Sequence, residues 1–207
     1  MVAFTADYYS FLGVTTVAKV QYNVCRLEEN IVSKVSALCQ QLAELLGQQN
    51  LVVATAESCT GGEIGARLTD LPGSSTWFNG GIISYANATK SKLLNVSADS
   101  LKEQGAVSEK VVLQMALGAC EKLDADLAVA VSGIAGPSGG SAEKPVGTVW
   151  IAWAWQDKRR GATSRLFHFD GDRDAIRKAT VEEAIRGLIQ QLTPALARAD
   201  KSVSKEN

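Results

Sequence analysis

Apolar residues along this chain follow two patterns, one typical of helices and one typical of buried strands. From residue 31 to residue 46 they recur at helical spacing, which predicts an amphipathic helix that Asn30 caps and Gly47 ends. The run LVVATA (51–56) is short, apolar and rich in β-branched residues, so it predicts a strand buried on both faces. The two patterns continue to alternate up to about residue 192.

The remaining elements complete a sheet covered by helices. Further strands are predicted over 78–86, 127–133, 148–155 and 164–169, and the last two are expected to pair as a hairpin. Further helices are predicted from the first strand to about residue 70, over 89–94 and 98–104, from the cap Ser108 to about residue 123, and after the cap Asp172. Strands interleaved with helices predict the α/β class, as a three-layer α/β/α domain with a mixed, mostly parallel central sheet.

The length of 207 residues fits one domain with short extensions. Residues 1–29 show neither helical periodicity nor clean alternation, so we interpret them as an N-terminal appendage of unknown role. They also lack the basic segment and the long apolar core of a signal peptide. The domain is predicted to span residues 30–196, followed by a polar tail over 197–207.

Composition argues against several classes of partner and cofactor. With 21 basic and 22 acidic residues, the net charge of −1 creates no global attraction to nucleic acid or to an anionic membrane. No apolar run reaches the roughly 18 residues of a transmembrane helix. Four dispersed cysteines and a single histidine, His168, favour neither a zinc site nor a disulfide framework. We therefore expect a cytoplasmic protein without metal, cofactor, nucleic-acid partner or membrane partner.

Three loops follow the carboxyl ends of predicted strands, which is where α/β sheets bind their ligands. The first, TAESCTGG, places Ser58 at a helix N-terminus beside two glycines, where exposed amides favour an anion or an oxyanion. Ser58 is either a nucleophile or an ordinary helix cap. The loop is not a G-x-S-x-G elbow, because Ala56 and Thr60 occupy the glycine positions.

The second loop, ISYANATKSK (83–92), carries a lysine near the end of a predicted strand. This lysine is a base, a phosphate ligand or simply a solvated surface residue. The third, SGIAGPSGGSAEKPVGT (132–148), is rich in small residues, as in a loop that approaches a ligand closely or one that is only structural. Its S-x-x-K match at Ser141 and Lys144 is interpreted as coincidence, because Pro145 and the glycines oppose a helix there. Arg173 is either a phosphate ligand or, as is commoner for a lone arginine, part of a surface salt bridge. His168 is expected to serve packing within a strand.

The chain resembles the nicotinamide-nucleotide amidohydrolases in the order and spacing of five segments. They are TAESCTGG, LPGSSTWFNGGIISYANATKSKLL, GAVSEKVV, VSGIAGPSGGSAEKPVGTVWIA and GDRDAIR. These amidohydrolases form the PncC family, whose domain also occurs as the C-terminal domain of the competence-damage protein CinA. The resemblance covers about residues 31–192 and is closest to the stand-alone form. It implies a three-layer α/β/α fold and hydrolysis of nicotinamide mononucleotide to nicotinate mononucleotide and ammonia, in pyridine nucleotide recycling.

The resemblance also implies roles for individual residues. Ser58 corresponds to the catalytic serine of the family and Lys90 to its catalytic lysine. A free lysine has a pKa of about 10.4, so burial or a neighbouring cation must lower the pKa of Lys90 before it can act as a base. Backbone amides between Ser58 and Gly62 are candidates for the oxyanion hole. Substrate contacts are implied at Thr60, Gly61, Tyr85, Ser132, Gly133, Ile134, Ala135, Gly136, and Arg173 or Arg177.

Three alternatives remain open from the sequence. The chain is a catalytically silent nucleotide-binding or regulatory member of the same fold, a hydrolase of another amide, or an assembly domain whose glycine loops serve packing. The apolar, tryptophan-rich segment 148–155 also makes a homo-oligomer an expectation.

Overall fold

The computed structural model describes residues 34–203, and the surroundings of side chains as far as residue 193. The predicted appendage over residues 1–29 and the predicted cap Asn30 lie outside the described residues. A five-stranded sheet forms the centre of the domain, in the order β2-β1-β3-β4-β5. The strands are β1 (Val53–Glu57), β2 (Phe78–Ile83), β3 (Leu127–Gly133), β4 (Thr148–Trp155) and β5 (Ala162–His168).

The sheet is mixed, as the sequence predicted. Strand β1 pairs in parallel with β2 and β3, while β4 is antiparallel to both β3 and β5. The predicted hairpin of 148–155 with 164–169 is therefore confirmed. Strands β1, β2, β3 and β5 therefore run in one direction and β4 runs against them, as expected for a mixed, mostly parallel sheet. The parallel strands β1 and β2 end at the same edge of the sheet, and this edge holds the candidate site.

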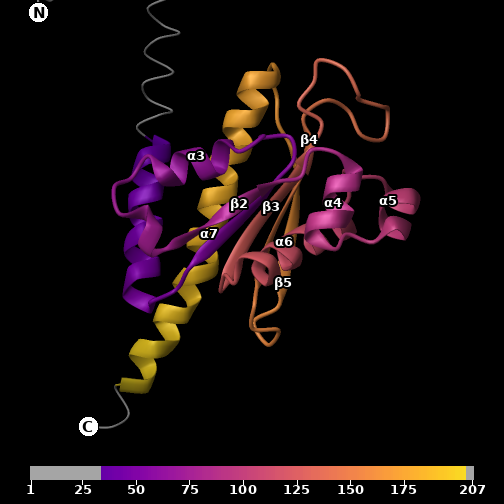
Figure 1. Ribbon diagram of the computed structural model, residues 1–207. Helices are drawn as coiled ribbons and strands as arrows, with labels where there is room; N and C mark the ends of the chain where they lie inside the picture. Colours follow the sequence, from indigo (N-terminus) through magenta and orange to yellow (C-terminus); the bar gives the residue numbers. More distant parts are fainter. Residues whose placement is uncertain (1–33, 204–207) are drawn as a thin grey trace, which may run out of the picture.

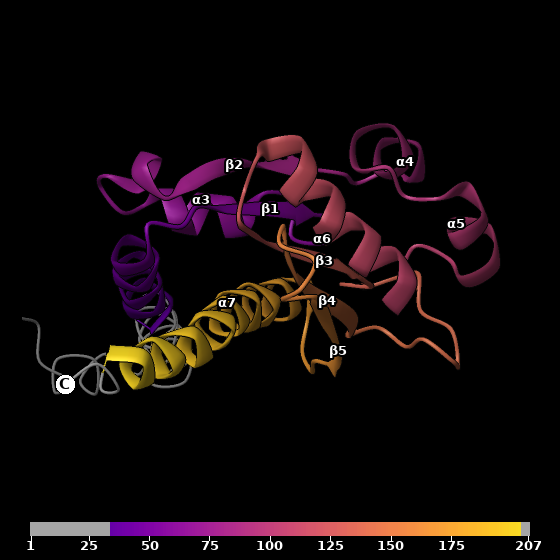
Figure 2. The same ribbon diagram turned by 90° about the horizontal axis from the view of Figure 1, so that it is seen from below.

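Helices cover both faces of the sheet, which confirms the three layers (Figures 1 and 2). One face carries a helix over residues 34–49, α3 (Glu63–Thr69) and the long α7 (Arg173–Val203). The other face carries α6 (Glu109–Leu123), flanked by α4 (Asn87–Leu94) and α5 (Ala98–Gln104). No helix within residues 34–203 combines the length and the apolar character needed to cross a bilayer.

Side chains of different size line the two faces of the central strands. Toward α7, β3 and β4 present large residues such as Val129 and Trp153, which fill the space beneath the helices. Toward α6, the central strands present six alanine methyl groups, which let that helix pack close to the sheet. These alanines are Ala54, Ala56, Ala128, Ala130, Ala152 and Ala154.

The tryptophans of β4 divide between the faces as the alternation predicted. Trp153 and Trp155 belong to the core on the α7 side, whereas Trp150 packs against the core on the α6 side. Within the chain, the side chains of β4 are buried except for Trp150, which is half-buried. The homo-oligomer stays a prediction.

Helix boundaries differ from the predictions in three places. The first helix continues through Gly47 to residue 49, and Asn50 takes the left-handed conformation with a φ of 50°. Ser108 stands at the N-cap of α6, but its hydroxyl donates to the carbonyl of Gly105 and caps no amide. Helix α7 extends to Val203, into the segment predicted as a polar tail. The Asp172 cap is confirmed, since its carboxylate accepts from the amide of Ala175 at 2.9 Å.

Candidate functional site

Two side chains from different loops meet at the carboxyl ends of β1 and β2. Ser58 follows β1 directly, and Lys90 lies in the first turn of α4, which follows β2. The Lys90 Nζ is 3.0 Å from the Ser58 Oγ, within hydrogen-bond distance. The structure therefore brings together the two residues that the resemblance implied as catalytic, although they are separated by 32 positions in the sequence.

The Lys90 side chain is enclosed by backbone rather than by carboxylates. It is only 1% exposed, and its Nζ donates to the carbonyls of Ser84 at 2.6 Å and Tyr85 at 3.2 Å. Burial lowers the pKa of Lys90 from its ordinary value of 10.5, because a charged ammonium is less well solvated there than in water. The lowering that a lysine base requires thus comes from burial and not from a neighbouring cation.

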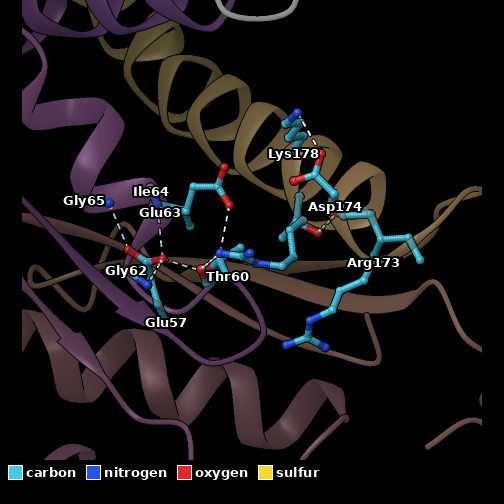
Figure 3. A network of polar contacts seen from close by, with 12 residues as sticks. Glu57, Thr60, Gly62, Glu63, Ile64, Gly65, Arg173, Asp174 and Lys178 are labelled. Carbon is cyan, nitrogen blue, oxygen red and sulfur yellow. Dashed lines mark hydrogen bonds and ion pairs between the residues drawn. The ribbon is translucent and has the colours of Figure 1, made fainter. Parts of the chain in front are cut away.

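A buried carboxylate organises the turn that carries Ser58. Glu57, the last residue of β1, is 1% exposed and accepts hydrogen bonds from the start of α3 (Figure 3). Its donors are the hydroxyl of Thr60 at 2.7 Å and the backbone amides of Gly62, Ile64 and Gly65 at 2.9, 3.1 and 2.9 Å. The sequence analysis missed Glu57. The available signal was an acidic residue directly before a serine, a threonine and two glycines.

The same contacts decide which amides of the turn are available. Those of Ser58, Gly61 and Gly62 donate to the carbonyl of Val131, the carbonyl of Ser58 and the carboxylate of Glu57, respectively. Of the predicted oxyanion donors between Ser58 and Gly62, the amides of Cys59 and Thr60 are the two that donate to no oxygen of the turn, and both lie next to the Cys59 thiol. The Thr60 side chain is fully buried and points to Glu57, so its hydroxyl is engaged within the turn.

The glycine-rich loop and the start of α7 form an open cavity of about 610 Å³ next to this turn. Arg173 crosses it, and its guanidinium donates to the carbonyl of Gly136 at 2.9 Å and to the hydroxyl of Tyr85 at 3.1 Å. Tyr85 is 60% exposed. The lining consists of Ala135, Pro137, Val146, Gly171, Asp172, Arg173, Asp174 and Arg177.

Arg177 lies deeper and is already paired. Its guanidinium forms an ion pair with Glu63 at 3.1 Å and donates to the carbonyl of Thr60 at 2.8 Å. Arg173 instead contacts two neutral oxygens. Figure 3 shows its guanidinium directed away from the pair of Asp174 and Lys178. Of the two arginines, Arg173 is thus the one whose contacts leave its charge uncompensated.

The other predicted loop residues divide between the site and its scaffold. Ser132 is 1% exposed, and its hydroxyl donates to the carbonyl of Ala106. Gly133 pairs with Val149 in the sheet, and Ile134 donates to the carbonyl of Thr148, so both hold the base of the loop. Gly61 is exposed at the turn with a φ of 65°.

Cys59 and Lys144 are both engaged in the structure of the loops that carry them. Cys59 is free and 6% exposed, and burial raises the pKa of its thiol to about 11. Lys144 donates to the carbonyls of Gln104 and Val107, both at 2.8 Å, which ties the glycine-rich loop to the end of α5. Ser141 accepts from the amide of Lys144 within a turn, in keeping with the interpretation of S-x-x-K as coincidence.

His168 ends β5 and is exposed, so the expected packing role is wrong. Its ring Nδ1 lies 3.5 Å from the hydroxyl of Thr148, and the outer strand leaves the rest of the ring in solvent. Among the side chains described, over residues 34–193, there is no group of three or more histidines, cysteines, aspartates or glutamates arranged to hold a metal ion.

Comparisons with known proteins agree with this geometry. A family model described as the CinA C-terminal domain matches residues 35–192. Nicotinamide-nucleotide amidohydrolase PncC of Escherichia coli strain K12 is 46% identical over 159 residues, which cover 77% of this chain and 95% of that protein. The protein of the same name from Pseudomonas putida is 48% identical over 160 residues, covering 75% of this chain and 96% of the relative. The crystal structure of competence/damage inducible protein CihA from Agrobacterium tumefaciens matches with a TM-score of 0.74 at 41% identity, covering 76% of this chain and 95% of that chain.

Proposed function

Because this chain belongs to the CinA C-terminal domain family, we propose that it is an amidohydrolase that converts nicotinamide mononucleotide to nicotinate mononucleotide and ammonia. The observation that carries the proposal is the distance of 3.0 Å between the Lys90 Nζ and the Ser58 Oγ. Two similar proteins are named nicotinamide-nucleotide amidohydrolase, which supports the same activity here. The presence of both groups in hydrogen-bond contact favours an active enzyme over a silent nucleotide-binding member of the fold.

As an ammonium, the Lys90 Nζ donates to the Ser58 Oγ, and the same three contacts also fit the neutral amine that a base requires. A neutral amine has two hydrogens and one lone pair. The carbonyls of Ser84 and Tyr85 accept the two hydrogens, and the lone pair is then left for the hydroxyl of Ser58. Burial favours this neutral form, since it lowers the pKa of Lys90 and increases the neutral fraction near pH 7.

The proposed reaction proceeds in two halves. Lys90 takes the hydroxyl proton as the Ser58 Oγ forms a bond to the carboxamide carbon, and the carbonyl oxygen becomes an oxyanion. When the C–N bond breaks, Lys90 returns the proton to the leaving nitrogen, and ammonia departs. Water then attacks the acyl-enzyme with Lys90 again as base, and release of the carboxylate restores the Ser58 hydroxyl.

The oxyanion requires donors that the fold has not already used. The amides of Cys59 and Thr60 fit this role, because they belong to the turn that carries Ser58 and are not engaged by Glu57, unlike those of Gly62, Ile64 and Gly65. The residue directly after a nucleophile commonly supplies such an amide in α/β hydrolases.

The cavity next to the turn suits the nucleotide part of the substrate. Its volume of about 610 Å³ lies within the roughly 300–1,000 Å³ of small-molecule sites. We assign the phosphate to Arg173, because its charge faces only neutral oxygens, whereas the charge of Arg177 is compensated by Glu63. In this assignment Arg177 supports the Thr60 carbonyl, and the Tyr85 hydroxyl accepts from Arg173.

The setting of the reaction follows from its chemistry. Conversion of a nicotinamide nucleotide to a nicotinate nucleotide is a step in the recycling of pyridine nucleotides. Cys39, Cys59 and Cys120 are free thiols within the described residues, which supports a reducing compartment such as the cytoplasm.

A substrate panel tests the proposal. Ammonia release is measured from nicotinamide mononucleotide, nicotinamide riboside, nicotinamide and glutamine under identical conditions. The mononucleotide is expected to be hydrolysed with the highest kcat/KM, at least about tenfold above the riboside, since charge-assisted hydrogen bonds to its phosphate contribute about 1.5–3 kcal/mol each. A higher kcat/KM on glutamine would reassign the substrate, and no release from any amide would favour the silent alternative.

A further inference from the structure

The Glu57 carboxylate lies one residue before the proposed nucleophile and contacts no group of the proposed reaction. Both of its oxygens act only as acceptors. Oε2 receives the Thr60 hydroxyl and two backbone amides, while Oε1 receives the Gly65 amide at 2.9 Å and the Thr55 hydroxyl at 3.3 Å. A side chain that is 1% exposed and receives five donors is fixed in one place.

These contacts make Glu57 the N-terminal cap of α3, although it precedes the helix by several residues. The N-cap position itself is Gly62, with a φ of 101° and no side-chain bond. Helix α3 has only seven residues, and a helix of that length is not stable alone in water. The carboxylate satisfies three of its free amides and matches the positive end of its dipole, so Glu57 determines where the helix begins.

The position at which α3 begins also determines the shape of the turn over residues 58–62. At one end, the Ser58 amide donates to the Val131 carbonyl at 3.1 Å. At the other, Glu57 holds Thr60 by its hydroxyl and Gly62 by its amide. The Gly61 amide closes the turn onto the Ser58 carbonyl at 3.1 Å. With the turn closed in this way, the Ser58 Oγ lies 3.0 Å from the Lys90 Nζ.

We propose that Glu57 is a positioning residue, which holds the turn over residues 58–62 closed so that the Ser58 hydroxyl stays aligned with Lys90. The proposal rests on the proposed function, since it takes Ser58 as the nucleophile. The direction of the side chain fits this role. Glu57 shares the face of β1 with Thr55, on the side of α3, whereas Lys90 approaches from α4 on the opposite side.

The test compares Glu57→Gln with the same carboxylate-to-amide change at the other end of β1. Asp126 accepts from the Val52 amide at 2.9 Å, so Asp126→Asn is a matched control at a distance from the site. In Glu57→Gln, an NH2 group must face at least one N–H donor of α3. We expect kcat to fall by about 10- to 100-fold, as for a slightly misplaced reacting group, while KM changes by less than about threefold. Asp126→Asn is expected to keep kcat within about twofold.

A serine-directed fluorophosphonate gives a readout that does not depend on the natural substrate. The rate of Ser58 labelling, followed by mass spectrometry of the intact protein and its peptides, should fall in Glu57→Gln in proportion to kcat. The midpoint of the rising pH limb of kcat should stay within about half a pH unit of the wild type, because Lys90 still supplies the base.

Several outcomes would overturn the proposal. Unchanged kcat and labelling in folded Glu57→Gln would show that the turn holds without the carboxylate. Disappearance of the pH limb would make Glu57 an acid or base itself.

If Glu57→Gln does not fold, Thr60→Val removes one of the same contacts without changing the shape of the side chain. It should lower labelling several-fold, and a normal labelling rate would contradict the proposal. A wild type that labels at Ser58 but releases no ammonia from the mononucleotide would refute the proposed substrate alone. A wild type that does not label would refute the nucleophile and the positioning role together.

Discussion

Replacing Lys90 with Met tests how much of the proposed catalysis depends on one buried amine. The substitution keeps an unbranched side chain in a position that is 1% exposed, and it removes the Nζ contacts to Ser58, Ser84 and Tyr85. A positioned general base contributes about 10²- to 10⁴-fold to the rate, so kcat is expected to fall by at least a factor of about 100. Lys90→Arg should lose at least as much, because a guanidinium stays protonated at any pH compatible with folding.

If Lys90 is the base, the kcat of the wild type should change with pH in a defined direction. Lys90 acts as a base when neutral, so kcat should rise with pH and level off above the pKa of the folded protein. Burial lowers that pKa below the ordinary value of 10.5, so the midpoint of the limb should lie below 10.5. The limb should be absent in Lys90→Met.

Stability should change in the same pH window for a thermodynamic reason. Because folding lowers the pKa of Lys90, the unfolded chain binds more protons than the folded chain between the folded pKa and about 10.5. The free energy of unfolding of the wild type, relative to Lys90→Met, should therefore rise with pH across this window and be constant below it. Cys39 and Cys120 titrate in both proteins, so their contribution cancels in the difference, whereas the buried Cys59 thiol interacts electrostatically with Lys90 and adds to the difference at high pH.

The assay measures initial rates of ammonia release from pH 6 to pH 10, with urea unfolding of both proteins at each pH. Circular dichroism confirms that each variant is folded before its rate is compared. A folded Lys90→Arg with nearly normal activity would refute the reasoning, since a permanent cation would then be sufficient. A limb that persists in Lys90→Met would assign the titrating base to another group.

Other predictions follow from the remaining contacts of the site. Arg173→Ala should raise KM for nicotinamide mononucleotide by about tenfold or more and leave nicotinamide riboside nearly unaffected, because a charge-assisted hydrogen bond contributes about 1.5–3 kcal/mol; equal losses on both substrates would contradict the phosphate assignment. Cys59→Ala should keep kcat within about twofold, because the Cys59 thiol is buried and its pKa is raised to about 11. A hundredfold loss in the folded variant would instead point to Cys59 as the nucleophile. Dialysis against EDTA should leave the rate unchanged, since the proposed steps use only Ser58, Lys90 and water, and a loss that zinc or magnesium restores would refute them.

The fold was predictable where local pattern and burial agree. Strands β3 and β4 begin and end where the apolar runs 127–133 and 148–155 do, because strands buried on both faces are apolar throughout. The helix over residues 34–49 was predicted to stop at Gly47, but packing of Leu42 and Leu46 carries it further. Local propensity yields to tertiary packing at such positions.

The site was predictable only in part, because its contacts depend on neighbours in space. The approach of Ser58 and Lys90 follows from parallel pairing of β1 with β2, which brings two strand ends to one edge. The role of Glu57 was not visible, since capping rules consider residues next to the helix and this carboxylate stands six positions before Glu63. The inward direction of the Thr60 hydroxyl and the pairing of Arg177 with Glu63 likewise required the packed structure.

The most direct test of the central claim is a product measurement with wild type and Ser58→Ala. Nicotinate mononucleotide and ammonia are quantified together from nicotinamide mononucleotide, with both proteins shown to be folded. The account predicts equimolar products from the wild type and a rate lower by at least about three orders of magnitude in Ser58→Ala. A folded wild type that forms neither product, or a Ser58→Ala variant that retains more than about a tenth of the rate, would contradict it.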